Sequence, residues 1–252
     1  MKLLKSIWNF FFGEGDQAKI ERFKRNYKNT GLQVPKNLQQ MTKLQFGFGR
    51  PFQAPSTVDL RDYCTQTENQ GSNPWCAAYS AANWAENILW RKNDYIQNIG
   101  PEMLYREAKK IDGDPDTDGT TLDAVLQVLL NKGYFDPNKC KIQVIWNYSG
   151  WENSLRYAIH KFGACLIGCN ITEEWYLVGG KKTSVTGKSH NTCVGGHAVL
   201  CCGYNRDGII IQNSWGEEWG AYGFGLITWE ALRRQFLYAA VLTNCLNDFK
   251  MN

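Results

Sequence analysis

No stretch of this 252-residue chain is apolar enough to cross a membrane. A spanning helix needs about 20 consecutive apolar residues, and polar residues interrupt every run before that length. The chain also lacks internal repeats and low-complexity segments, while 43% of its residues are hydrophobic and 13% are aromatic. This composition excludes a disordered chain and predicts a globular protein of one or two domains.

The first residues lack the features of a signal peptide. Lys5, Ser6 and Asn9 interrupt the apolar run, and no small-residue cleavage site follows. The apolar residues here share one helical face: Leu3, Leu4, Ile7, Trp8 and Phe11. We expect this helix to dock on its own protein, with contact to a membrane surface as the less favoured alternative. Without a leader, a cytoplasmic location is expected.

Basic residues are concentrated at the front of the chain. Residues 1–50 carry ten Lys/Arg against three Asp/Glu, and the remainder carries eighteen against twenty-one. A basic segment can contact lipid, nucleic acid or the chain's own acidic face, and only the last needs no other molecule. We therefore expect an intramolecular contact and no nucleic-acid partner.

Two kinds of local structure are predicted after the first helix. A second helix from about Gln17 to Thr30 carries the apolar stripe Ile20, Phe23 and Tyr27. Residues 32–57 contain several prolines and glycines, which exclude a long helix and favour an extended segment.

A cysteine lies at the start of the next predicted helix, after Gln70-Gly71-Ser72-Asn73-Pro74-Trp75. Asn73 is a good N-cap and Pro74 suits the first helical position, so Cys76 is expected in the first turn of a helix ending near Leu89 or Trp90. The helix dipole and the unpaired amides favour an anion there. They bias the thiol toward the thiolate, the form that attacks a carbonyl carbon.

Three further side chains could complete a nucleophilic site. Gln70, on the loop before Cys76, could donate to a developing oxyanion. His197 follows two glycines and precedes an apolar run, and Asn213 ends the next apolar run. The turn at residues 205–208 joins the two runs into a hairpin, which could hold His197 beside Asn213. Each residue alone would be an ordinary packed or turn residue, but together they predict a base and its orienting group.

This ordered set resembles the papain-like cysteine peptidases. In that family a glutamine, a Gly-Ser pair and the nucleophilic cysteine are followed far downstream by His-Ala and Asn-Ser-Trp-Gly. Here His197 and Asn213 follow Cys76 by 121 and 137 residues, against roughly 130–150 in the family. The resemblance runs from about Val58 to Trp229.

The resemblance implies an activity and the roles of the residues. Cys76 would attack a polypeptide substrate and form a thioester, with His197 as acid and base, Asn213 orienting the imidazole and Gln70 receiving the oxyanion. No metal or organic cofactor would be required. Isopeptide cleavage, another acyl transfer on the same site, and a binding module that keeps the fold without catalysis remain alternatives.

The resemblance also implies substrate contacts. The main chain of Gly119 would pair with an extended substrate, beside Asp118, and Ile167 would contribute an apolar contact. Trp215 would cover the hydrogen bond between His197 and Asn213.

The chain departs from the family pattern at a disulfide bridge. Asn73-Pro74-Trp75 replaces the usual Cys-Gly-Ser, and the region of residues 114–119, where the partner cysteine would lie, has no cysteine either. Both halves of that bridge are missing together, so the loss concerns the bridge rather than the site.

A run of acidic residues next to Gly119 resembles a calcium loop: Asp112, Asp114, Asp116 and Asp118. With Asp114 as the first position, Val125 stands at the twelfth, where a bidentate Glu is required, so calcium is disfavoured. Thr120 or Thr121 is instead predicted to cap a helix that continues to Asn131.

The nine cysteines lack the spacing of a zinc finger. Several fall in apolar strands, where free cysteine is common. We expect reduced thiols and no metal site.

The order of elements predicts an α+β protein. Helices come first, and apolar strands dominate from residue 164 onward. The resemblance implies a two-lobed papain-like fold, with a helical lobe carrying Cys76, a β-barrel-like lobe carrying His197 and Asn213, and the cleft between them. Residues 55–252 would form the catalytic domain, and residues 1–54 a short inhibitory pro-segment or docking element.

Overall fold

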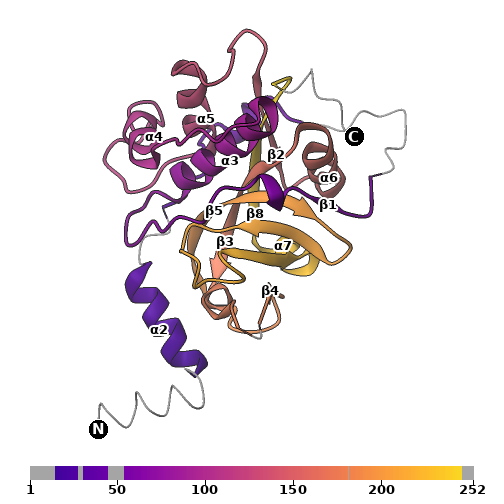
Figure 1. Ribbon diagram of the computed structural model, residues 1–252. Helices are drawn as coiled ribbons and strands as arrows, with labels where there is room; N and C mark the ends of the chain where they lie inside the picture. Colours follow the sequence, from indigo (N-terminus) through magenta and orange to yellow (C-terminus); the bar gives the residue numbers. More distant parts are fainter. Residues whose placement is uncertain (1–14, 28–30, 45–53, 181, 246–252) are drawn as a thin grey trace.

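The computed structural model describes residues 15–27, 31–44, 54–180 and 182–245 (Figure 1). The helix predicted around residues 3–11 lies outside them. Among the described residues no helix is long and apolar enough to pass through a bilayer.

The helical lobe is built from α3 (Cys76–Asn93), α4 (Pro101–Ala108) and α5 (Leu122–Asn131), which pack on one another. The predicted cap of α5 is confirmed, because the Thr121 side chain accepts a hydrogen bond from the Ala124 amide. The predicted start of α3 is wrong. The helix begins at Cys76 itself, and Asn73 lies in a preceding turn where its amide donates to the Gln70 carbonyl at 3.2 Å.

The strands of the described residues form one sheet in the order β2-β8-β3-β5-β6-β7-β4, with β1 paired to β5. Their bounds are β1 (Val58–Asp59), β2 (Lys141–Trp146), β3 (Cys165–Thr172), β4 (Ser184–Val185), β5 (Cys193–Tyr204), β6 (Gly208–Gln212), β7 (Phe224–Thr228) and β8 (Phe236–Thr243). All pairs are antiparallel except β4 with β7. The predicted hairpin joins β5 to β6, and Asn205 holds its turn by accepting from the amides of Asp207 and Gly208.

The remaining helices are α2 (Asp16–Asn26), α6 (Trp151–Phe162) and α7 (Trp229–Gln235), with short 3-10 turns η1 (Leu38–Gln40), η2 (Arg61–Tyr63) and η3 (Glu173–Leu177). The predicted stripe of α2 is buried, with Ile20, Phe23 and Tyr27 at most 5% exposed. In Figure 1, α2 lies at the β side of the molecule, away from α4 and α5.

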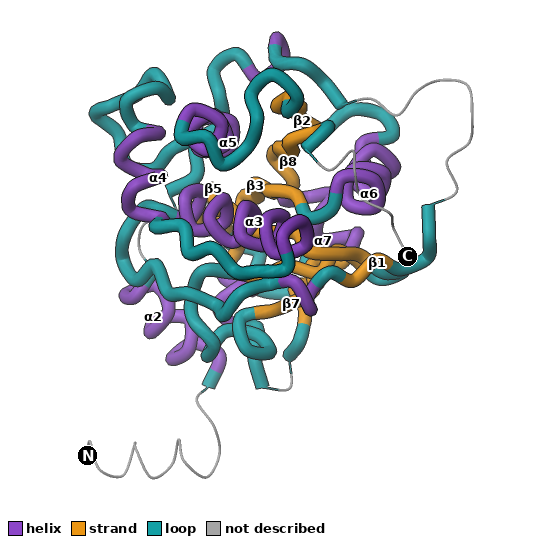
Figure 2. The backbone as a smooth tube through the Cα atoms, turned by 45° about the horizontal axis from the view of Figure 1, so that its top comes forward, coloured by secondary structure: helices purple, strands orange, loops and turns teal. Residues whose placement is uncertain are grey.

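The sheet separates two hydrophobic cores, because successive residues of a strand point to opposite faces. Along β5, Ala198 and Leu200 join the core beneath α3 and α5, whereas Val199 and Cys201 join the core around α6, α7 and α2. Figure 2 shows α3 lying across the strands, with α6 and α7 elsewhere on the sheet. The predicted α+β class with a helical and a β lobe is confirmed.

The cysteines differ from the expected fully reduced set at one pair. Cys140 and Cys245, with Cα atoms 5.1 Å apart, form a disulfide, and the other seven cysteines are free. These two residues are 105 positions apart in the chain, and only the pairing of β2 with β8 brings their neighbourhoods together.

Candidate active site

Cys76 is the first residue of α3 and is completely buried. Burial raises the pKa of its thiol to about 12, against the effect of backbone N–H groups from Ala198, Ala77 and Cys76 itself, which lower it. The expected thiolate is therefore not the form favoured in this structure at neutral pH, because desolvation outweighs the helix N-terminus. Because the Ala198 backbone N–H interacts with the Cys76 thiol, the thiol lies next to the residue that follows His197.

His197 and Asn213 are adjacent, as the sequence predicts. The Nε2 atom of His197 lies 2.8 Å from Oδ1 of Asn213 in a buried hydrogen bond. An amide oxygen only accepts, so Nε2 carries a proton and donates it. In the neutral ring this leaves Nδ1 as the nitrogen that can accept a proton. The Ser214 amide also donates to Oδ1 at 2.8 Å, which holds the Asn213 side chain in place.

Aromatic rings enclose this pair. Trp215 is 1% exposed, and its ring centroid lies 4.7 Å from that of His197. Trp175 meets the imidazole edge-on, with centroids 6.1 Å apart. Trp215 therefore lies where the sequence predicts a cover for the hydrogen bond.

Gln70 is buried beside the same elements, but its amide is engaged. Its Nε2 donates to the Asn73 carbonyl at 2.8 Å, and its Oε1 accepts from the Ser214 hydroxyl at 2.6 Å. These two bonds fix the plane of the amide. The second hydrogen on Nε2 is the one that could reach an oxyanion.

A short stretch of the chain itself, residues 31–33, lies between the two lobes. The Thr120 amide donates to the Gly31 carbonyl at 2.9 Å, and the Gln33 amide donates to the Thr120 carbonyl at 3.0 Å. On the other side, the Leu32 amide donates to the carbonyl of Gly196, the residue before His197, at 3.1 Å. We call the space between Thr120 and Gly196 the interlobe cleft.

The main chain that pairs with this stretch belongs to Thr120, one residue after the Gly119 expected to pair with a substrate. The Gly119 amide donates to the Tyr105 hydroxyl at 3.2 Å, and its carbonyl accepts from Lys109. Gly119 still contributes close approach, because a Cβ atom there would overlap the Gly31 carbonyl. Asp118 is exposed, and its carbonyl accepts from the Gln33 side chain at 3.0 Å.

The prediction that Ile167 contacts substrate is wrong. Ile167 is fully buried in the core on the far face of β3. Its neighbour Gly168 faces the cleft, where an added Cβ would meet the Leu32 side chain at 2.5 Å and the Tyr238 ring at 3.4 Å. Strand alternation explains the difference of one residue.

Tyr238 is a cleft residue that the sequence analysis missed. It is completely buried, and its hydroxyl accepts from the Leu122 amide at 2.7 Å and donates to the Gln33 carbonyl at 3.2 Å. Its apolar strand gives no local signal for this position.

Tyr105 on α4 connects the two loops that the absent family bridge would have joined. Trp75 stacks on Tyr105 with ring centroids 5.4 Å apart, and the Tyr105 hydroxyl holds Gly119. The start of α3 and the loop before α5 are thus linked without a disulfide.

A lysine occupies the acidic loop. The ammonium group of Lys109 lies 2.9 Å from a carboxylate oxygen of Asp112 and donates to the carbonyls of Asp114 and Gly119. The described part of the chain has no cluster of three His, Cys, Asp or Glu side chains arranged to hold a metal ion.

Known proteins share this sequence pattern and this fold. Procathepsin L of Felis catus is 25% identical over 210 residues, covering 70% of this chain and 62% of that protein. Fruit bromelain of Ananas comosus is 26% identical over 219 residues, covering 77% and 61%. Xylellain, a cysteine protease from Xylella fastidiosa, superposes with a TM-score of 0.65 at 18% identity, covering 87% of this chain and 97% of that structure. No family model matches the sequence.

In sequence this chain is similar to papain-family cysteine peptidases, and its fold is that of papain-like proteases. It spans about three fifths of the length of the curated relatives above. Because the sequence identity with xylellain is only 18%, that superposition shows a shared fold and nothing more.

Proposed function

We propose that this protein hydrolyses peptide bonds, with Cys76 as the nucleophile and His197 as the general acid and base. The observation that carries the proposal is the hydrogen bond from His197 Nε2 to Asn213 Oδ1, next to a cysteine at a helix N-terminus. A thiol, an imidazole that can take its proton and a group that orients the imidazole are the parts that nucleophilic acyl transfer needs.

In the proposed mechanism Nδ1 of His197 takes the proton of the Cys76 thiol as the sulfur attacks the scissile carbonyl. The Cys76 amide and the second Nε2 hydrogen of Gln70 donate to the oxyanion. His197 then protonates the leaving amine, which leaves a thioester on Cys76. The same imidazole afterwards activates the water that hydrolyses this thioester.

An extended polypeptide is the substrate class that the cleft favours. Residues 31–33 already lie there, bonded through main-chain groups to Thr120 on one wall and Gly196 on the other. Main-chain pairing of this kind accepts many sequences, because it does not involve the side chains.

We further propose that the N-terminal segment, residues 1–54, restrains the enzyme. The buried face of α2 stacks Tyr27 on Trp215 with centroids 5.0 Å apart, and the Tyr27 hydroxyl donates to the Trp215 carbonyl at 2.8 Å. Lys24 pairs with Glu173, and Arg22 pairs with Glu218 at 3.0 Å. A covalently attached strand has a high effective concentration, so even a weak fit blocks the cleft.

A thiol-directed epoxide with an intact-mass readout tests the proposed function. We expect one adduct, mapped to Cys76, together with hydrolysis of a peptide library that Cys76→Ala cannot perform. Cys64→Ser, which removes a half-buried free thiol outside the site, is the matched control and should retain activity. A Cys76→Ala protein with unchanged turnover would exclude the proposed peptidase.

A further inference from the structure

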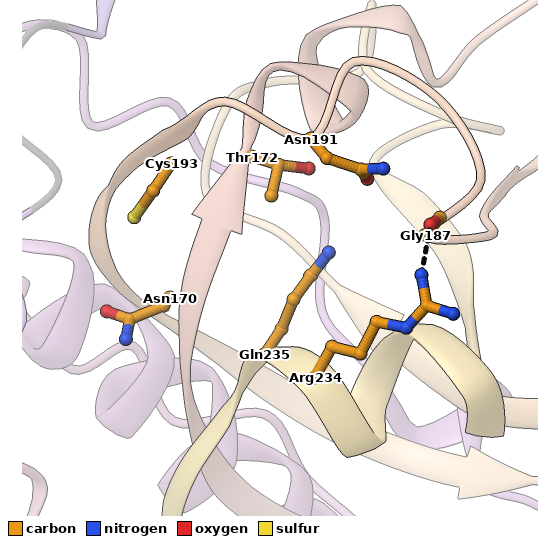
Figure 3. A pocket seen from close by; sticks show the side chains of 7 residues that line it. All are labelled: Asn170, Thr172, Gly187, Asn191, Cys193, Arg234 and Gln235. Carbon is orange, nitrogen blue, oxygen red and sulfur yellow. Dashed lines mark hydrogen bonds between the residues drawn. The ribbon is translucent and has the colours of Figure 1, made fainter.

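A cavity of about 350 Å³ lies on the β lobe, between the ends of β3 and β5 and the α7–β8 junction. Figure 3 shows side chains from all three elements around it. Its lining presents both apolar and polar surface, from the side chains of Asn170, Thr172, Asn191, Cys193, Arg234 and Gln235. None of these residues takes part in the proposed bond cleavage.

Two nearly buried donors face this cavity without a full set of partners. Thr172 is 8% exposed, and its hydroxyl has no hydrogen-bond partner among the described residues. Gln235 is 4% exposed, and its Oε1 accepts from Trp175 Nε1 at 2.8 Å. This bond fixes the Gln235 amide so that its nitrogen points toward Thr172 and Asn191 (Figure 3). A buried hydroxyl without a partner is costly unless a ligand or water completes it.

The charge of the lining disfavours an anion. The Arg234 guanidinium donates to the Gly187 carbonyl at 2.9 Å and pairs with Glu230 at 2.9 Å, so its charge is already compensated. The other side chains are neutral. Asn170 offers an amide that can donate or accept, whereas the Asn191 amide nitrogen donates to the carbonyls of Ser189 and Gly187 and leaves its oxygen as an acceptor. A carboxamide, with one acceptor oxygen and two N–H donors, matches such a mixed lining better than a carboxylate does.

The cavity is close to the interlobe cleft. Asn170 is paired with Gly196, whose carbonyl binds the Leu32 amide. Gly168, two positions before Asn170 and on the same face of β3, contacts the Leu32 side chain. Two residues of a strand span about 7 Å. A long side chain of a peptide in the cleft can therefore reach from this position into the cavity.

We propose that this cavity is a specificity site for a substrate side chain that ends in a carboxamide, that of glutamine above all. The identity of the ligand rests on the proposed peptidase function. The test below does not use hydrolysis, so a failure of this inference is separate from a failure of that function.

Cys193 provides the readout, because it is an exposed free thiol on the cavity wall. The full chain is alkylated with N-ethylmaleimide, and the rate at Cys193 is followed by peptide mapping with and without N-acetyl-glutamine methylamide. A ligand at ten times its Kd leaves about one tenth of the sites open, so we expect about tenfold slower labelling. The glutamate and norleucine analogues should protect far less.

Thr172→Val removes the buried hydroxyl and keeps the side-chain shape. We expect it to weaken protection by the glutamine analogue about fivefold, the value of one neutral hydrogen bond. Thr183→Val, at an exposed threonine that does not line the cavity, is the control and should leave protection unchanged. Absence of protection by the glutamine analogue overturns the site, and equal protection by glutamate overturns the preference for a carboxamide.

Discussion

Substitution of Tyr27 tests whether α2 holds the N-terminal segment over the active site. Tyr27 is 5% exposed, stacks on Trp215 and donates a buried hydrogen bond to its carbonyl. Tyr27→Ala removes the stack and the hydrogen bond together. Tyr27→Phe removes only the hydrogen bond, so the two variants separate these contributions.

The expected magnitudes follow from these contacts. Truncating a buried aromatic side chain to alanine costs about 3–5 kcal/mol, whereas losing one neutral hydrogen bond costs about 1 kcal/mol. If this loss weakens the docking of α2, Tyr27→Ala shifts the equilibrium from covered toward open enzyme by about two to four orders of magnitude. Tyr27→Phe shifts it about fivefold.

The assay compares full-length proteins by hydrolysis of a fluorogenic peptide and by alkylation of Cys76. Both rates should rise in the order wild type, Tyr27→Phe, Tyr27→Ala, until the open form predominates. Tyr222→Ala, at a tyrosine that is 78% exposed, is the control and should match wild type.

A folded Tyr27→Ala protein with wild-type rates in both assays would refute the proposed restraint. A rise in alkylation without any hydrolysis would instead show that α2 covers the thiol but that the site does not cleave the peptides used. Circular dichroism and the melting temperature verify that the variant remains folded.

Four further outcomes are expected. His197→Ala should lower kcat/KM by about three orders of magnitude or more, and Asn213→Ala should lower it less, because Asn213 positions the base and does not transfer the proton. The rate of Cys76 alkylation in the full chain should keep rising with pH toward about 12, since burial raises the pKa of that thiol. Tyr27→Ala should move the inflection of this pH–rate curve to lower pH, because opening the site lets water reach the Cys76 thiol. Burial acts to raise the pKa of Glu174, but hydrogen bonds from Thr186, Gly187 and Lys182 outweigh it and lower the pKa below the ordinary 4.5. The ionised carboxylate therefore stabilises the fold above pH 4.5, and this contribution is lost as the pH falls. Thermal melts should show Glu174→Gln destabilised by about 1–3 kcal/mol at pH 7 and much less at pH 3. Thiol counting under denaturing, non-reducing conditions should find seven free cysteines and a Cys140–Cys245 disulfide. If most of those seven cysteines were also paired, the expected cytoplasmic location would be contradicted.

Local patterns in the sequence were sufficient for most elements around the site. The cap of α5 follows from Thr121, which precedes an apolar helical run. The turn at residues 205–208 predicts the hairpin whose strands bring His197 to within 2.8 Å of Asn213. These features depend on contacts between residues near in sequence, which a linear pattern records directly.

The exact residues that face each other across the cleft could be assigned only from the tertiary structure. Whether Gly119 or Thr120 pairs with an extended chain, and whether Ile167 or Gly168 faces it, depends on a shift of one residue, which reverses the side chain's direction in a strand. The bonds that engage Gln70 also involve Ser214, 144 positions away, and no local pattern specifies such a partner.

The protonation of Cys76 shows the same division. The sequence determined that this thiol lies at the N-terminus of a helix, where the unpaired amides and the helix dipole favour the thiolate. The tertiary structure decided that the thiol is completely buried, and burial raises its pKa to about 12. The helix acts through a few neighbouring amides, whereas desolvation sums over every atom that excludes water, and those atoms come from segments far apart in the chain.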